Sequence, residues 1–201
     1  MRKIIKTLII SLVMIAIIFI NAKEVVANND NYVEVIDEVI NFFEELVVET
    51  EEVNESLISI NVLYDSSTKT YMDFRLITSK SSPQYNYIYN LGLIEFCNDG
   101  HLREDEYIGV ALGSYFGNIG DKFIFKLDSG IELKLIKLDE KNDNHTIDGF
   151  IHNEDESVIE FVINEDLMED KRAENGYIYG GNFNNAQQYK GKIIEIWKVV
   201  N

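Results

Sequence analysis

The stretch KFIFKLDSGIELKLIKL, residues 122–138, decides the fold class of this chain. It contains two runs rich in Ile, Leu and Phe, which are separated by Asp128, Ser129 and Gly130. Short apolar runs bounded by turn residues are typical of β-strands. The stretch therefore predicts two strands joined by a turn.

Segments of the same character extend this pattern along the chain, at residues 93–97, 107–112, 157–163 and 192–199. Residues 57–64 and 70–78 are also rich in β-branched and aromatic residues, and the turn residues 65–67 between them predict a hairpin. Many short strands with glycine at their joins favour a mainly β (α+β) domain that closes into a small barrel. A doubly wound sheet would need repeated helical crossovers.

Two short helices are expected between these strands. Ser82 followed by Pro83 predicts a helix start, because serine caps a helix and proline fits its first turn. Asn164, followed by two acidic residues, predicts a second helix that runs to about residue 174, where Gly176 is a natural stop.

Residues 1–27 have the layout of a signal peptide or membrane anchor. Three basic residues precede an apolar run at residues 7–22. As a helix this run spans about 24 Å, which is less than the roughly 30 Å of a bilayer core. We therefore expect cleavage before Asn28, and an uncleaved segment would act as a tilted anchor. Either way, the sequence predicts an extracellular or cell-surface protein.

Residues 28–56 form a separate acidic segment. Val33, Ile36, Ile40, Phe43 and Val47 follow the three-and-four spacing of an amphipathic helix, with acidic residues on its other face. The polar residues 49–55 are expected to form a hinge. Residues 57–201 then make up the predicted β-barrel domain.

The composition limits the partners that this protein can have. The formal net charge of −17 repels nucleic acid and anionic lipid, so we expect no nucleic-acid partner and membrane contact only through the N-terminal segment. Cys97 is the single cysteine, which excludes an internal disulfide and leaves stability to the core. The sequence predicts no cofactor and no metal site, and it makes no prediction of the oligomeric state.

The most polar stretch of the domain, residues 139–156, is expected to be a loop between two apolar strands. Three interpretations remain open for it. Crowded carboxyls can raise one pKa enough for general acid chemistry, oxygen ligands can bind calcium, or the loop is simply hydrated. The titratable residues of the stretch are Asp139, Glu140, Asp143, His145, Asp148, His152, Glu154, Asp155 and Glu156.

Residues 78–164 resemble a group of exported or mobile-element-associated bacterial proteins, which in turn resemble double-psi β-barrels of the three-aspartate type. The resemblance is carried by TSKSSPQY at 78–85, VALGSYF at 110–116, IGDK at 119–122, DEKNDNHT at 139–146 and SVIEFVI at 157–163. The sequence departs from the pattern at Leu138 and Asn142, where a glycine and a small residue are usual. The resemblance implies a six-stranded double-psi-like barrel.

The same resemblance implies a site and a substrate. Asp139, Asp143 and Asp148 match the aspartates of the group, with Asp143 or Asp148 as the acid, and His145 would orient or polarise. The implied activity is that of a lytic transglycosylase, which needs one acid because a hydroxyl of the sugar itself displaces the leaving group. The leading hypothesis is therefore a secreted or surface-tethered barrel that acts on or binds peptidoglycan glycan strands. The alternative is a non-enzymatic envelope or mobile-element accessory protein that mediates protein contacts.

Overall fold

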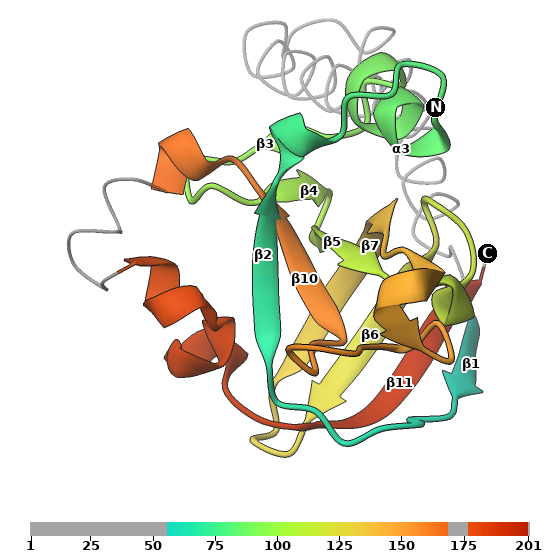
Figure 1. Cartoon of the computed structure of the whole chain (residues 1–201), viewed down its shortest axis with the longest axis vertical. Helices are drawn as coiled ribbons and strands as arrows, with labels where there is room; N and C mark the ends of the chain where they lie inside the picture. The colour runs from blue at the N-terminus through green and yellow to red at the C-terminus, as the bar shows by residue number, and fades with distance from the viewer. Residues whose placement is uncertain (1–55, 169–176, 201) are drawn as a thin grey trace, which may run out of the picture. The chain divides into compact units, whose positions relative to one another are not determined.

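A mixed β-sheet is the main element of the structure, a computed structural model that describes residues 56–168 and 177–200 (Figure 1). These residues belong to one compact unit, Glu55–Val200. The strands are β1 (Ser56–Ile60), β2 (Lys69–Asp73), β3 (Glu95–Phe96), β4 (Leu102–Glu104), β5 (Tyr107–Leu112), β6 (Lys122–Leu127), β7 (Glu132–Glu140), β8 (Thr146–Ile147), β9 (Ile151–His152), β10 (Ile159–Ile163) and β11 (Ile193–Val200).

The helical elements are short. Residues 165–168 are helical, as predicted, and the rest of that predicted helix lies outside the described residues. The elements are α3 (Pro83–Tyr85), the π-helix η2 (Asn86–Asn90) and the 3₁₀ helices η1 (Phe74–Leu76), η3 (Ser114–Phe116), η4 (Asp143–His145), η5 (Tyr177–Gly181), η6 (Phe183–Asn185) and η7 (Gln187–Tyr189). Ser82 caps α3 by accepting a hydrogen bond from the Tyr85 amide, which confirms the predicted start.

The sheet has the strand order β1-β11-β6-β7-β5-β10-β2. The pairs β5–β7 and β10–β2 are parallel, and the other pairs along this path are antiparallel. The domain is therefore mainly β with a mixed sheet, as the strand pattern predicts. Residues 107–112 and 122–127 form strands with the predicted bounds.

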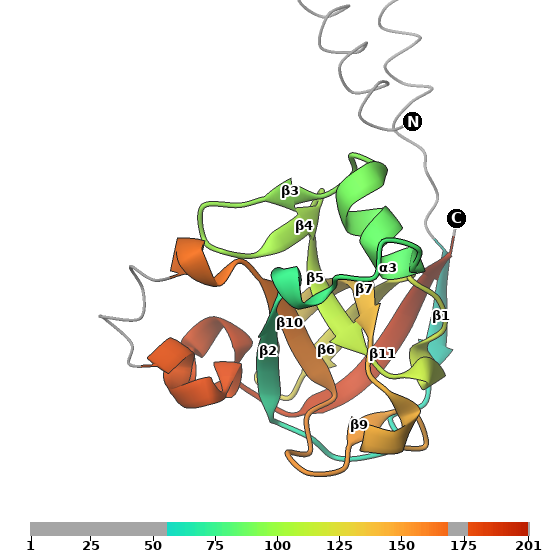
Figure 2. The ribbon, with the colours of Figure 1, turned by 45° about the horizontal axis from the view of Figure 1, so that its top comes forward.

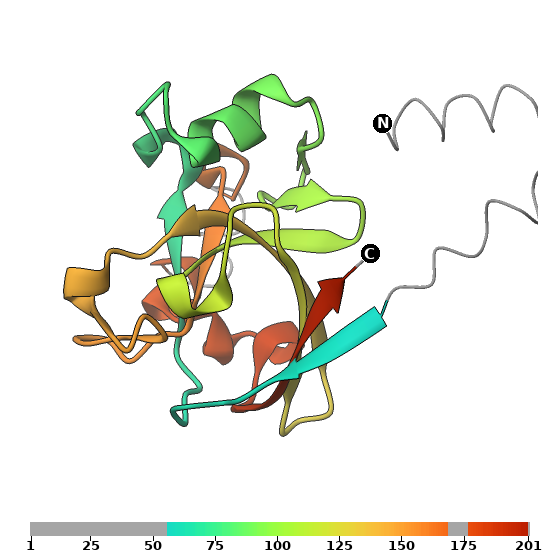
Figure 3. The same cartoon turned by 90° about the vertical axis from the view of Figure 1, so that its right-hand side faces the viewer.

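The sheet is strongly curved (Figure 3). Strand pairing among the described residues leaves β1 and β2 as ends, so the pairing itself does not close. Two single contacts connect the start of β11 with the region before and at the start of β2. The Ile193 amide donates to the Ser66 carbonyl at 3.1 Å. The buried Lys69 Nζ donates to the Gly191 carbonyl at 2.7 Å. The start of β11 is therefore tied to the segment that leads into β2.

Two sequence expectations are wrong. Residues 57–64 and 70–78 do not form a hairpin, because β1 pairs with β11 and β2 pairs with β10. A segment rich in β-branched and aromatic residues favours a strand, but its composition does not determine which other strand it pairs with. The polar stretch 139–156 is not all loop either, since Asp139 and Glu140 end β7, and β8 and β9 form a small hairpin within it.

The predicted signal segment, residues 1–27, and the predicted amphipathic helix and hinge, residues 28–56, lie outside the described residues except for Ser56. Within 56–168 and 177–200, no helix combines the length and hydropathy that spanning a bilayer requires.

The two faces of the sheet carry two hydrophobic clusters. The larger contains Val110, Leu112, Phe123 and Phe161, and the smaller contains Ala111. The alternation of Val110, Ala111 and Leu112 along β5 sends neighbouring side chains into different clusters. Both faces of the central strand are therefore buried, which a chain without disulfides requires.

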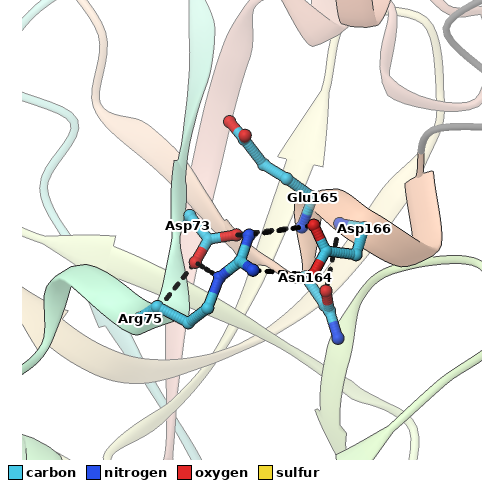
Figure 4. A network of polar contacts seen from close by, with 5 residues as sticks. All are labelled: Asp73, Arg75, Asn164, Glu165 and Asp166. Carbon is cyan, nitrogen blue, oxygen red and sulfur yellow. Dashed lines mark hydrogen bonds and ion pairs between the residues drawn. The ribbon is translucent and has the colours of Figure 1, made fainter.

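The end of β2 is joined to residues 164–166 by a polar network (Figure 4). Asp73 accepts hydrogen bonds from Arg75 Nε at 2.7 Å and from the Glu165 amide at 3.0 Å. Arg75 Nη1 also donates to Asp166 at 2.6 Å. Burial raises the pKa of Asp73, but these hydrogen bonds outweigh it and lower the pKa below 3.8. The ionised carboxylate therefore holds the two segments together.

The larger cluster should dominate stability. Phe161 is fully buried, so Phe161→Ala should lower the free energy of unfolding by about 3–5 kcal/mol. Leu76 is 70% exposed, and Leu76→Ala should change it by less than about 0.5 kcal/mol. Urea unfolding measures both, and similar losses in the two variants would contradict this assignment of the core.

The polar network predicts a loss of stability in acid. Because the pKa of Asp73 is lowered on folding, its contribution is present above pH 3.8 and is lost as the pH falls through the folded pKa. At neutral pH, Asp73→Asn should cost about 1.5–3 kcal/mol, since it removes charge-assisted hydrogen bonds.

The matched control is Asp166→Asn. The Asp166 side chain is 67% exposed, so this change should cost less than about 1 kcal/mol. Urea unfolding at several pH values reads out both variants. A difference between Asp73→Asn and the parent that persists unchanged at the lowest pH would argue against the role of the ionised carboxylate.

Candidate functional site

Two carboxyls flank one small residue on the sheet. Ala111 of β5 pairs with Asp139 of β7 on one side and with Glu160 of β10 on the other. Glu160 pairs in turn with Thr70 of β2. Directly paired residues share a face of the sheet. Asp139, Ala111, Glu160 and Thr70 therefore form a line across four strands, called here the acid row.

A β-bulge places Asp139 in this row. Lys137 pairs with Val110 and Asp139 with Ala111, so Leu138 is an extra residue on β7. Val110 and Ala111 point to opposite faces, and the extra residue therefore turns Asp139 away from the face of Lys137 and onto that of Ala111. Without the bulge, Lys137 and Asp139 would share a face.

Both carboxyls of the acid row are half-buried, and burial raises the pKa of each. A hydrogen bond from the Gln84 side chain partly offsets this effect at Asp139. The positive charge of Lys141 partly offsets it at Glu160, whereas the negative charges of Asp155 and Asp139 add to it. Both groups therefore hold a proton more readily than ordinary carboxyls do.

A buried polar network around Ser157 lies next to the acid row. Lys141 Nζ donates to the Ser157 carbonyl at 3.0 Å and to its Oγ at 2.8 Å, and Thr70 Oγ1 lies 3.3 Å from the same Oγ. The Ser157 amide donates to Asp155 at 2.8 Å, and His152 Nδ1 lies 3.2 Å from this carboxylate. Ser157 is fully buried, so it cannot act as a nucleophile despite the neighbouring amine.

The arrangement has the properties of a general acid site. Burial lowers the pKa of Lys141, and the charges of Glu160 and Asp155 raise it. Lys141 interacts with Glu160 and Asp155, and the positive charge that acts on Asp139 is that of Lys137. Ionising Asp139 and Glu160 together would place two negative charges in a partly desolvated place. A partly buried carboxyl of raised pKa is a candidate general acid, because a general acid protonates the leaving oxygen.

The other predicted site residues lie in the neighbouring loops. Ser114 Oγ donates to Asp143 at 2.6 Å, and the Tyr64 hydroxyl donates to Asp148 at 2.5 Å. Asp143, His145 and Asp148 are exposed. The structure therefore places Asp139 and Glu160 on either side of Ala111, whereas Asp143 and Asp148 each accept a hydrogen bond from a hydroxyl of a different segment.

Two glycines allow the 113–117 segment and the segment around Gly149 to pack closely against each other. A Cβ on Gly113 would lie 1.8 Å from the Gly149 carbonyl oxygen, and the Tyr115 amide donates to that oxygen at 3.1 Å. Gly149 itself has a φ of +63°, which disfavours any side chain. The backbone contact fixes Ser114 beside the loop that carries Asp143 and Asp148.

The sequence pattern does not predict Glu160, Lys141 or Gln84 as site residues. A signal for Glu160 was present, because it is the one charged residue in the apolar run VIEFVI at 158–163. A carboxyl within a buried strand is costly unless it has partners or a function. Gln84 and Lys141 carry no comparable signal, since their contacts depend on the tertiary structure.

Within the described part of the chain, no group of three or more His, Cys, Asp or Glu side chains is arranged to hold a metal ion. Comparison of the chain with protein-family models, with curated proteins and with solved structures found no match.

The raised pKa of Glu160 predicts that this residue costs stability at neutral pH. Its folded pKa lies above 4.5, so its contribution is most favourable below pH 4.5 and is lost as the pH rises through the folded pKa. Glu160→Gln should therefore raise the melting temperature at pH 7, with a gain that disappears in acid. The control Glu132→Gln, at an exposed position of β7, should leave it unchanged. Thermal unfolding from pH 3.5 to 8 tests this, and a lower melting temperature of Glu160→Gln at pH 7 would refute it.

Proposed function

We propose that this protein is an exported barrel protein that cleaves the glycan strands of peptidoglycan, with Asp139 and Glu160 as the reacting carboxyls. The acid row carries the proposal, because it combines two half-buried carboxyls of raised pKa with a small residue between them. The substrate comes from the resemblance of residues 78–164 to three-aspartate barrel proteins.

The proposal includes closure of the sheet into a double-psi-like barrel. Six strands, β2-β10-β5-β7-β6-β11, follow one another in the sheet. The hydrogen bonds of Ile193 to Ser66 and of Lys69 to Gly191 bridge the place where β11 would meet β2. These two bonds support a barrel whose last seam is joined by single contacts in place of a ladder.

One acid is sufficient for this reaction, and in our proposal the second carboxyl of the acid row assists it in the opposite proton state. A hydroxyl of the sugar attacks its own anomeric carbon, the bond from that carbon to the bridging oxygen breaks, and the bridging oxygen takes a proton from the general acid. The second carboxyl accepts the proton of the attacking hydroxyl. We assign Glu160 as the acid and Asp139 as the base, because hydrogen bonds from the Glu140 backbone and from the Gln84 side chain favour the ionised form of Asp139.

The loop residues have a secondary part in this proposal. The Asp143 and Asp148 carboxylates accept hydrogen bonds from Ser114 and Tyr64. We place them, with His145, at the rim of the site, where they contact the substrate without transferring its protons. The protein would work outside the cell or at the cell surface, and a membrane would be contacted through the N-terminal segment if that segment is not cleaved.

Release of soluble fragments from purified peptidoglycan tests the proposal. Glu160→Gln should lower the rate by about 100-fold or more, which is the usual contribution of a general acid. Asp139→Asn should have an effect of similar size. Asp143→Asn should retain the rate within a few fold, because Asp143 transfers no proton in this proposal. The matched control is Glu132→Gln, which neutralises an exposed carboxyl of β7 outside the site and should leave the rate unchanged.

Two results would reject this assignment. Loss of release in Asp143→Asn, with full release by Glu160→Gln, would move the chemistry to the loop. A wild-type protein that releases nothing, although it is folded, would leave the non-enzymatic accessory role as the better hypothesis.

A further inference from the structure

Four aromatic rings from four separate elements meet beside the helix α3–η2. They are Phe74 of η1, Tyr85 of α3, Tyr89 of η2 and Phe96 of β3, called here the aromatic platform. The ring centroids of Tyr85 and Tyr89 are 4.3 Å apart, those of Phe74 and Phe96 are 4.9 Å apart, and those of Phe74 and Tyr89 are 6.1 Å apart. The rings therefore form one continuous group.

The platform is open to solvent, unlike the other large ring cluster. Tyr89 is 40% exposed and Phe96 is 42% exposed, whereas Phe116, Phe123 and Phe161 are at most 1% exposed. Two further apolar side chains are exposed next to these rings in the chain. Leu76 of η1 is 70% exposed, and Leu91, which follows η2, is 48% exposed. Grouped apolar side chains on a surface mark a place that binds something.

The platform is continuous with the acid row. Gln84, which hydrogen-bonds Asp139, immediately precedes Tyr85 in α3, and Figure 2 shows α3 beside β7. Phe74 and Tyr85 pack against the core cluster that contains Ala111, so they lie on the face of the sheet that carries the acid row. Thr70 of the acid row lies three residues before Asp73, where β2 ends, which along the strand is about 10 Å, and Phe74 follows directly in η1.

The chemistry of this surface fits a sugar chain better than other ligands. A sugar ring has an apolar C–H face and a rim of hydroxyls, and tyrosine offers an apolar ring with a polar tip. Polyanions are disfavoured by the net charge of −17. Asp73 and Arg75, next to Phe74, are paired with each other, so this edge of the platform does not present one unpaired charge.

From this continuity we propose that the aromatic platform binds the sugar rings of a glycan chain whose reacting bond lies over the acid row. The assignment rests on the proposed function for its substrate, and it adds where the rest of the chain is held. Stacking on Tyr89 and Phe96 would fix the register of the chain, so that one glycosidic bond lies between Asp139 and Glu160.

Binding of a soluble hexasaccharide of N-acetylglucosamine tests the platform separately from cleavage. The experiment uses Glu160→Gln protein, in which the chain stays intact, and measures affinity by titration calorimetry. Adding Tyr89→Ala or Phe96→Ala should weaken binding at least about tenfold, in line with the loss of a stacked aromatic ring. The matched control is Tyr115→Ala, an aromatic residue 37% exposed in the 113–117 loop, and it should leave the affinity within about twofold.

Chemical shifts provide a second measurement that does not depend on how the platform variants Tyr89→Ala and Phe96→Ala fold. In the Glu160→Gln protein, the hexasaccharide should shift the amide signals of residues 84–91 and 95–97. Shifts confined to the 113–117 and 143–150 loops, unchanged affinity in both platform variants, or no binding at all would overturn the platform. A protein that binds on the platform but releases nothing from peptidoglycan would keep the platform and reject the cleavage function.

Discussion

The position of β5 between β7 and β10 is the constraint on which the rest of the structure depends. This strand pairs in parallel with β7 and antiparallel with β10, and it is buried on both faces. One face contributes Val110 and Leu112 to the larger core, and the other presents Ala111 to the acid row. If β5 moved by one residue in its register, these faces would exchange and the two carboxyls would lose the small residue between them.

The acid row lies where burial makes its ionisation cost stability. Burial favours the protonated forms of Asp139 and Glu160, so ionising them works against folding. The surrounding structure offsets this cost, because Lys141 is held by Ser157 below the row and the aromatic core fills the opposite face. Carboxyls with pKa values raised by burial are found most often at functional sites.

The helix α3–η2 links the two parts of the proposed site. It contributes Gln84 to the acid row and Tyr85 and Tyr89 to the aromatic platform. Its second half is a π-helix, a form that is rare and occurs often at functional sites. Ile88 anchors the helix in the smaller core cluster, so the same packing holds Gln84 at the acid row and the two tyrosines at the aromatic platform. A change in this packing would alter the proposed acid row and the proposed aromatic platform together.

The sequence by itself determined the mainly β class, the bounds of β5 and β6, and the capped start of α3, since periodicity, turn residues and caps are local properties. Its choice of Asp139, Asp143, His145 and Asp148 as site residues stays a prediction. The tertiary structure alone decided that β1 and β2 lie at opposite ends of the sheet, and that Glu160 lies across Ala111 from Asp139. Strand partners and the bulge at Leu138 depend on contacts between residues distant in the chain, which local pattern does not encode.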